Sequence, residues 1–253
     1  MVERIGNKVI SFFNEIGQFV LFCGAIGQHI IKGHIRVKLV IEQMVYAGVN
    51  SLPITVLTAL FVGMAFAIQV VKELLRFGAP DLIGGVVALA IWRELGPLLT
   101  GVVVAGRVGS AISAEIGSMK VTEQVDALES MSQDPVEYLV VPRVLALSLM
   151  LPLLVGIADI VGYLGGFIIA MSSQSVNPYS YVNSAQTMLT PIDIGGGLIK
   201  ALFFGGITAT IGSYMGLKAT SGAKGVGRIT RQAVVNALIT IFILNYFISL
   251  VIF

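Results

Sequence analysis

The chain has 253 residues, of which 56% are hydrophobic and only 12% are charged. Soluble domains carry about 25% charged residues, so a soluble protein of this composition could not cover its surface with polar groups. The net charge of +2 gives no indication of a nucleic-acid partner, and the single Cys23 excludes an internal disulfide bond. We therefore expect an all-α integral membrane protein.

Residues 1–45 are predicted to form an N-terminal interfacial amphipathic helix and a basic cytoplasmic stretch. From Ile5 to Val20 the apolar residues recur at helical spacing, while Lys8 and Glu15 fall elsewhere on the helix. Such a helix lies in the membrane interface with its apolar side against the lipid. A sixth membrane span is the competing interpretation. The basic stretch holds His29, Lys32, His34, Arg36 and Lys38.

Residues 46–253 are predicted to form one membrane domain with five transmembrane helices. Each apolar segment reaches or exceeds the about 20 residues needed to cross a hydrocarbon core. The predicted spans are 46–71, 82–112, 139–171, 192–217 and 229–253. Most of the 16 lysines and arginines lie on one side when the N-terminus is placed in the cytoplasm. The loop at 172–190 has no charge, as expected of an outer loop.

Two helix starts can be recognised from their capping residues. Asp134 precedes Pro135, and Thr190 precedes Pro191, with Asp193 at the third helical position. An oxygen-bearing side chain followed by proline is typical of the first turn of a helix. The sequence therefore predicts that the third and fourth spans begin close to these residues.

Small residues recur every fourth position in the second, third and fourth spans, as at Gly101, Ala105 and Gly109. Small residues let the backbones of membrane helices approach closely. The pattern predicts close helix contacts, either within one chain or between two copies of it.

The sequence contains no recognisable catalytic motif. H-E-x-x-H and G-x-S-x-G are absent, and GAKGVG at 222–227 does not fit a nucleotide-binding loop, which needs Gly-Lys followed by Ser or Thr. His29 and His34 lie close together on a basic stretch and make a poor metal pair. We therefore expect no catalytic residue, no metal site and no cofactor in this chain, and we do not expect it to be an enzyme.

The segment between the second and third spans is acidic. Its apolar residues Val121, Val125 and Leu128 fall on one helical face. An amphipathic helix at the cytoplasmic end of a long span is a candidate docking surface for a soluble partner. A solvated loop helix is the alternative interpretation of the same pattern.

Four runs within 93–143 and one run near the C-terminus resemble a known family. They are RELGP (93–97), AGRVGSAISAEIGSM (105–119), VTEQVDALESM (121–131), DPVEYLVVPR (134–143) and GAKGVGRITRQAVV (222–235). This combination is similar to the MlaE family, the permeases of ATP-binding-cassette (ABC) transporters that move lipids between membranes. The resemblance covers nearly the whole chain from near residue 45, and plastid and cyanobacterial members look most similar.

The resemblance implies a homodimer that works with separate subunits. A cytoplasmic coupling helix around 118–131, between spans two and three, would bind an ABC ATPase subunit, which would itself hold ATP and Mg. An MCE-domain lipid-binding protein would face the loop at 172–190. The membrane would be a bacterial inner membrane or a plastid inner envelope membrane. The residues implied to contact the ATPase are Glu115, Met119, Lys120, Thr122, Glu123, Gln124, Asp126, Ala127 and Glu129.

Charged residues inside the predicted spans form the second candidate site. A charge at the bilayer centre costs about 2.5–3.5 kcal/mol, so such residues should face one another or a cavity. In one interpretation they form ion pairs that join helices. In the other, Arg93 and Lys200 bind a lipid headgroup and Glu94 holds one of them in place, while Asp159 is structural. The apolar wall for the acyl chains would come from Leu57, Leu60, Phe61, Met64 and Ile68.

The sequence therefore indicates the permease subunit of an ABC transporter that moves phospholipid or another polar lipid. An ion-coupled secondary transporter that uses the intramembrane charges is the first alternative. The odd number of spans and the absence of a visible inverted repeat argue against it. A scaffold without transport activity is the second alternative.

Overall fold

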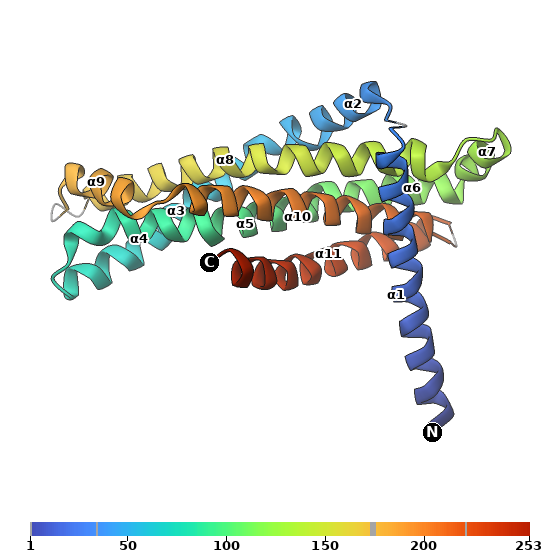
Figure 1. The fold of residues 1–253 in the computed structure, drawn as a ribbon, viewed down its shortest axis with the longest axis horizontal. Helices are drawn as coiled ribbons and strands as arrows, with labels where there is room; N and C mark the ends of the chain where they lie inside the picture. The colour runs from blue at the N-terminus through green and yellow to red at the C-terminus, as the bar shows by residue number, and fades with distance from the viewer. Residues whose placement is uncertain (1, 34, 173–175, 221) are drawn as a thin grey trace.

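The computed structural model describes residues 2–33, 35–172, 176–220 and 222–253, without the side chains of residues 2–9, 11 and 12. Within these ranges every regular element is helical, which confirms the predicted all-α fold. Most of the helices run side by side in a long bundle, and helix α1 (Val2–Ile31) projects from one end of it (Figure 1). His34, which belongs to the predicted basic stretch, lies outside the described residues.

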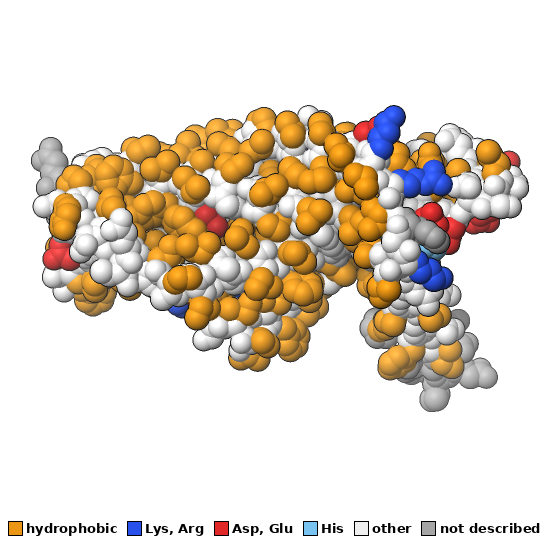
Figure 2. Space-filling view, turned by 45° about the horizontal axis from the view of Figure 1, so that its top comes forward, with side chains coloured by type: hydrophobic (Ala, Val, Ile, Leu, Met, Phe, Trp, Pro, Cys, Tyr) orange, Lys and Arg blue, Asp and Glu red, His pale blue; other side chains and the backbone are white. Residues whose placement is uncertain are grey.

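Five helical segments of the described chain are long and apolar enough to cross a membrane, as predicted. They are Val37–Arg76, Pro80–Val121, Val136–Ser172, Pro191–Leu217 and Gly222–Ile252. At about 1.5 Å per residue the second segment is roughly twice as long as the about 30 Å hydrocarbon core, so it also extends into water. Apolar side chains cover most of the bundle surface, and most charged side chains gather at the end where α1 lies (Figure 2).

The first span is broken near its N-terminal end. Helix α2 (Val37–Ala47) is followed by the short helix η1 (Val49–Ser51) and then by α3 (Leu52–Arg76). Pro53 explains the break, because proline has no N–H and its ring clashes with the carbonyl four residues earlier. The Ser51 hydroxyl donates a hydrogen bond of 2.6 Å to the Ala47 carbonyl at this point. The predicted start at residue 46 therefore falls at the end of α2.

The second span contains two wider π-helical turns that the sequence did not predict. Its elements are η2 (Pro80–Leu82), α4 (Ile83–Ala90), η3 (Ile91–Leu95), α5 (Gly96–Val104), η4 (Ala105–Gly109) and α6 (Ser110–Val121). The two π-helical turns are η3, which contains Arg93 and Glu94, and η4, which contains Arg107. Such turns are frequent at functional sites.

The third and fourth spans begin where their capping residues predict. The Asp134 carboxylate accepts a hydrogen bond of 2.8 Å from the backbone N–H of Val136, at the start of η5 (Val136–Val140) and α8 (Val141–Ser172). A capping box joins Thr190 and Asp193 at the start of α10 (Pro191–Leu217). Helix α11 (Gly222–Ile252) follows. The predicted outer loop at 172–190 contains a further helix, α9 (Pro178–Met188), while its residues 173–175 lie outside the described chain.

Glycines bring the helices of one chain into close contact around α8 and α10. A Cβ atom on Gly63 would overlap the carbonyl of Gly162, and a Cβ atom on Gly205 would overlap the carbonyl of Leu147. A Cβ atom on Gly212 would lie 2.9 Å from the Gly109 carbonyl oxygen. These small residues therefore serve packing within the chain.

Helix α1 is not among the five membrane-crossing segments of the described chain. The rings of Phe19 and Phe22 pack against Tyr214 near the end of α10, with centroids 5.2 and 5.3 Å away. Farther along, His29 Nε2 lies 3.0 Å from a carboxylate oxygen of Asp134. Other apolar side chains of α1 are exposed, as a helix lying against lipid requires: Ile10, Phe13, Ile16, Val20 and Leu21.

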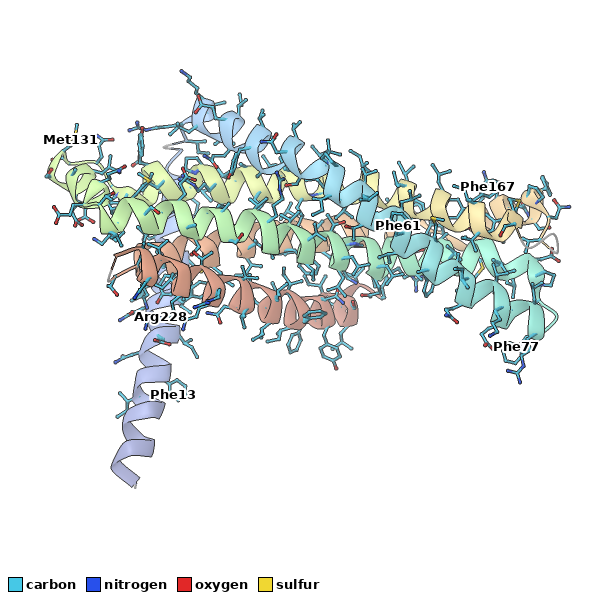
Figure 3. The ribbon with its side chains drawn as sticks, turned by 180° about the vertical axis from the view of Figure 1, so that it is seen from behind. Phe13, Phe61, Phe77, Met131, Phe167 and Arg228 are labelled. Carbon is cyan, nitrogen blue, oxygen red and sulfur yellow. The ribbon has the colours of Figure 1, made fainter. Side chains whose placement is uncertain are left out.

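The orientation can be tested with single cysteines in a Cys23→Ser background. Tyr179 on α9 is 76% exposed, and Met131 beside α7 (Gln124–Ser130) is 72% exposed. We expect Tyr179→Cys to react with a membrane-impermeant maleimide from the outside only. Met131→Cys, at the cytoplasmic end of the bundle and far from Phe77 in Figure 3, should react only after permeabilisation. The reverse labelling pattern would overturn the orientation.

Candidate functional site

The charged residues of the second span lie where a proline disturbs the helix. Pro97 removes one N–H and displaces the carbonyl four residues earlier, which belongs to Arg93. Lys200 of α10 takes the place of the missing donor, because its Nζ donates a hydrogen bond of 2.7 Å to the Arg93 carbonyl oxygen. The RELGP run therefore creates a backbone acceptor inside the membrane domain.

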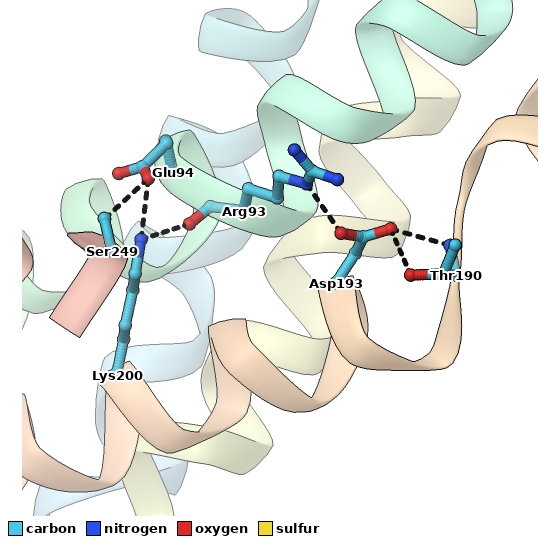
Figure 4. A network of polar contacts seen from close by, with 6 residues as sticks. All are labelled: Arg93, Glu94, Thr190, Asp193, Lys200 and Ser249. Carbon is cyan, nitrogen blue, oxygen red and sulfur yellow. Dashed lines mark hydrogen bonds and ion pairs between the residues drawn. The ribbon is translucent and has the colours of Figure 1, made fainter. Parts of the chain in front are cut away.

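Lys200 and Glu94 form an ion pair that joins three helical segments. The Lys200 side chain is 0% exposed, and its Nζ lies 2.7 Å from Glu94 Oε1 (Figure 4). Ser249 of α11 donates a hydrogen bond of 2.8 Å to the same oxygen, and Asn245 donates one of 2.8 Å to Oε2. A buried charge needs a partner and hydrogen bonds to be tolerated, and both are present here.

Arg93 is held at one side and remains accessible at the other. Its Nε donates a hydrogen bond of 2.6 Å to Asp193, whose other oxygen accepts hydrogen bonds of 2.7 and 2.8 Å from the N–H and hydroxyl of Thr190. The side chain is 39% exposed, and its terminal nitrogens point away from Asp193 (Figure 4). The ring of Phe253 lies 4.8 Å from the guanidinium carbon. Asp193 thus anchors a cation that can still meet a ligand.

The structure brings the predicted headgroup residues together but gives them different environments. Arg93 is accessible, whereas Lys200 is enclosed and fully engaged. Asp193 was predicted only as a helix cap. Its role as the Arg93 partner could have been inferred from its position at the start of a span that carries Lys200 one to two turns later. The enclosed Lys200 ammonium therefore fits the interpretation that the charges form ion pairs between helices. The exposed Arg93 guanidinium fits the interpretation that they bind a lipid headgroup.

The predicted apolar wall is divided between two faces of α3. Leu57, Phe61 and Ile68 are exposed by 56, 59 and 50% on the outer surface. Leu60 and Met64 instead turn toward α8, where a Cβ atom on Gly165 would lie 3.1 Å from each of their side chains. A narrow, mostly apolar crevice lies between α3, the η3–α5 segment and α8.

Asp159 lies beside this crevice, behind Gly96. Its side chain is 2% exposed, and its Oδ1 has no hydrogen-bond partner in the described residues. A Cβ atom on Gly96 would overlap this oxygen, so only glycine leaves room for the carboxyl group. Asp159 is therefore separate from the Arg93–Asp193 and Lys200–Glu94 pairs.

The predicted coupling segment is two helices rather than one. Helix α6 ends at Val121, and α7 starts after Glu123, whose φ angle of 61° lies in the left-handed region. The structure contains the predicted cytoplasmic helix between the second and third spans, but it covers Gln124–Ser130 rather than the whole 118–131 range. Val125 is 2% exposed and fixes α7 to the core. Of the predicted coupling residues, those with exposed side chains are Thr122, Glu123, Gln124, Asp126, Ala127 and Glu129.

Three other predicted coupling residues are engaged within the chain. Glu115 pairs with the buried Arg143 at 2.8 Å, and Met119 packs against the hydrophobic core. Lys120 Nζ lies 2.5 Å from Asp126 Oδ1, which ties the end of α6 to α7. The exposed surface open to a partner is therefore the turn and α7 itself.

Metal-ligating side chains do not cluster in the part of the chain that the structure describes. No group of three His, Cys, Asp or Glu residues there could hold a metal ion. His29 has carboxylate neighbours instead, at 3.0 Å from Asp134 and 3.6 Å from Glu137.

Comparison with known proteins places the chain among transporter subunits. The profile of the family described as Permease MlaE matches residues 40–251. A protein of Synechocystis sp. named "Probable ABC transporter permease protein" is 48% identical over 254 residues, covering 100% of this chain and 97% of that protein. The chloroplastic protein TRIGALACTOSYLDIACYLGLYCEROL 1 of Arabidopsis thaliana is 42% identical over 90% of this chain and 65% of its own length. The "Intermembrane phospholipid transport system permease protein MlaE" of Haemophilus influenzae is 34% identical, over 100% of this chain and 97% of its own length.

Proposed function

This chain belongs to the MlaE permease family, and from this premise we propose that it moves phospholipid or another polar lipid between two membranes. The chain is an ABC transporter permease and a multi-pass membrane protein. In the proposal it carries the lipid without changing it chemically, so it is not itself an enzyme. The name of the Haemophilus relative supports a phospholipid substrate.

The observation that carries the proposal is the accessible guanidinium of Arg93 inside a membrane span. An exposed charge in a span needs a polar partner. Arginine presents several N–H donors in a fork that matches phosphate oxygens. Asp193 fixes one edge of the side chain and leaves the other free. Lys200 and Glu94 hold the surrounding helices and do not contact the headgroup in this proposal.

A separate ATPase subunit supplies the energy in the proposed transporter. It binds ATP and Mg and contacts the exposed turn and α7 on the cytoplasmic face. Its closure moves two copies of this chain relative to each other. An MCE-domain lipid-binding protein meets α9 on the outer face. The proposed membrane is a bacterial inner membrane or a plastid inner envelope; one relative is named as chloroplastic and another as part of an intermembrane transport system.

Replacing Arg93 by glutamine tests the headgroup assignment. We expect ATP-driven transfer of a fluorescent phospholipid between proteoliposomes to fall about tenfold, because a hydrogen bond to a charged group contributes about 1.5–3 kcal/mol. Lys72→Gln removes an exposed cation at the outer end of α3 and should leave transfer unchanged. Normal transfer by the Arg93 variant would refute the assignment.

The same assay separates the alternatives. Transfer that requires ATP and persists when ion gradients are collapsed excludes an ion-coupled transporter. A scaffold without transport activity would show no phospholipid transfer at all, even when the complete assembly is reconstituted with ATP.

A further inference from the structure

The aromatic ring of Phe253 lies over both cations of the candidate site. Its centroid is 4.8 Å from the guanidinium carbon of Arg93 and 5.1 Å from Nζ of Lys200. The face of an aromatic ring carries partial negative charge and attracts a cation that lies within about 6 Å of the centroid. One aromatic side chain therefore attracts two like charges that come from two different spans.

Contacts with α10 and α11 hold this ring beside the cations. The backbone N–H of Phe253 donates a hydrogen bond of 2.9 Å to the carbonyl of Ser249, whose hydroxyl binds Glu94. On α10, a Cβ atom on Gly196 would lie 2.7 Å from the ring atom Cζ, so glycine leaves room for the ring. Phe253 is nonetheless 44% exposed. Its position therefore depends on these contacts rather than on enclosure in a core.

The ring and Asp193 restrict the guanidinium of Arg93 in different ways. Asp193 accepts a hydrogen bond of 2.6 Å from Nε, at one edge of the planar group. Phe253 lies over the central carbon of that group. The N–H groups of a guanidinium point outward in its plane, so a contact over the central carbon leaves the terminal nitrogens available. These nitrogens point away from Asp193 (Figure 4), so the ring orients the guanidinium without occupying its donors.

We propose that Phe253 is a positioning residue for the lipid headgroup. Its ring holds the guanidinium of Arg93 in the orientation that meets a phosphate, and it offsets the repulsion between Arg93 and Lys200. A donor that is already oriented loses less conformational freedom on binding, so the site fills at a lower lipid content. The role toward lipid rests on the proposed function, whereas the attraction between the ring and the two cations does not.

Fluorinated phenylalanines test this attraction in the chain alone. One or two fluorine atoms at the meta positions of Phe253 withdraw charge from the ring face, and Cζ beside Gly196 stays unchanged. We expect the unfolding temperature of the detergent-solubilised protein to fall stepwise with each fluorine, because the attraction to the cations weakens. The same series at Phe247 is the control, since this exposed ring of α11 has no described cation over it. An equal unfolding temperature across the Phe253 series would overturn the proposal.

ATP-driven transfer by the reconstituted assembly tests the role toward lipid. Cyclohexylalanine at position 253 keeps an apolar ring of similar size but has no aromatic face. We expect it to raise the phospholipid content at half-maximal transfer about fivefold and to leave the maximal rate unchanged. The two fluorinated variants should give intermediate values. A lower maximal rate with an unchanged half-maximal content would overturn the positioning role, because only folding or assembly would then be affected.

Gly196→Ala gives a second route to the same result. The added methyl group displaces the ring and should also raise the half-maximal lipid content. In a chain that carries Phe253→Leu it should have no further effect, because both changes act on one contact. Additive effects would overturn the proposal. Normal transfer by Arg93→Gln, together with a stepwise fall of the unfolding temperature in the fluorine series, would instead count against the proposed function alone.

Discussion

Exchanging Glu94 for alanine is expected to destabilise the folded chain by about 3–5 kcal/mol, because it removes the carboxylate that is paired with a buried ammonium group. Lys200 is 0% exposed, and its ammonium would keep the Arg93 carbonyl and the ring of Phe253, 5.1 Å away, but no carboxylate among the described residues. Its ammonium would have to lose its proton or draw the helices apart. The change should appear as a lower unfolding temperature of the detergent-solubilised protein.

The opposite exchange is expected to be less severe. Lys200→Met leaves Glu94 with the donors Asn245 and Ser249 and with a side chain that is 39% exposed. The double variant Glu94→Ala, Lys200→Met should therefore be more stable than Glu94→Ala alone, since neither charge then remains buried without a partner. Additive losses in this cycle would show that the two side chains do not act as a pair.

The five spans were predictable because hydrophobic length is a local property of the sequence. The capping residues Asp134 and Thr190 were predictable for the same reason, since each acts on the backbone two or three residues away. The break at Pro53 and the π-helical turns were not predicted. They depend on which backbone carbonyls find new donors, such as Lys200 for Arg93, and this is settled only by packing.

The candidate site was predictable as a set of residues but not as an arrangement. Charged side chains inside a span need a polar partner. This requirement correctly grouped Arg93, Glu94 and Lys200. The sequence could not decide which cation would be enclosed, because exposure depends on how α11 covers the η3 turn. It also assigned five residues of α3 to one wall, although helical rotation turns Leu60 and Met64 toward α8.

Reversing the charge at Glu123 is expected to detach the ATPase subunit. Glu123 is exposed at the turn before α7, and no other described residue pairs with it in a salt bridge or side-chain hydrogen bond. Replacing a charge at an interface by its opposite costs at least about 2 kcal/mol, so co-purification of the ATPase with Glu123→Arg should fall about thirtyfold or more. The permease should still insert and fold, because exposed substitutions change stability by only about 0.5 kcal/mol.

Two controls separate the charge from the shape of the turn. Glu42→Arg makes the same reversal at an exposed position of α2, outside the tip, and should leave co-purification unchanged. Glu123→Gly removes the carboxylate but adopts a φ angle of 61° without strain. If Glu123→Gly binds the ATPase normally while Glu123→Arg does not, the carboxylate itself makes no contact and the tip only requires the absence of positive charge. If both bind normally, α7 is not the coupling helix.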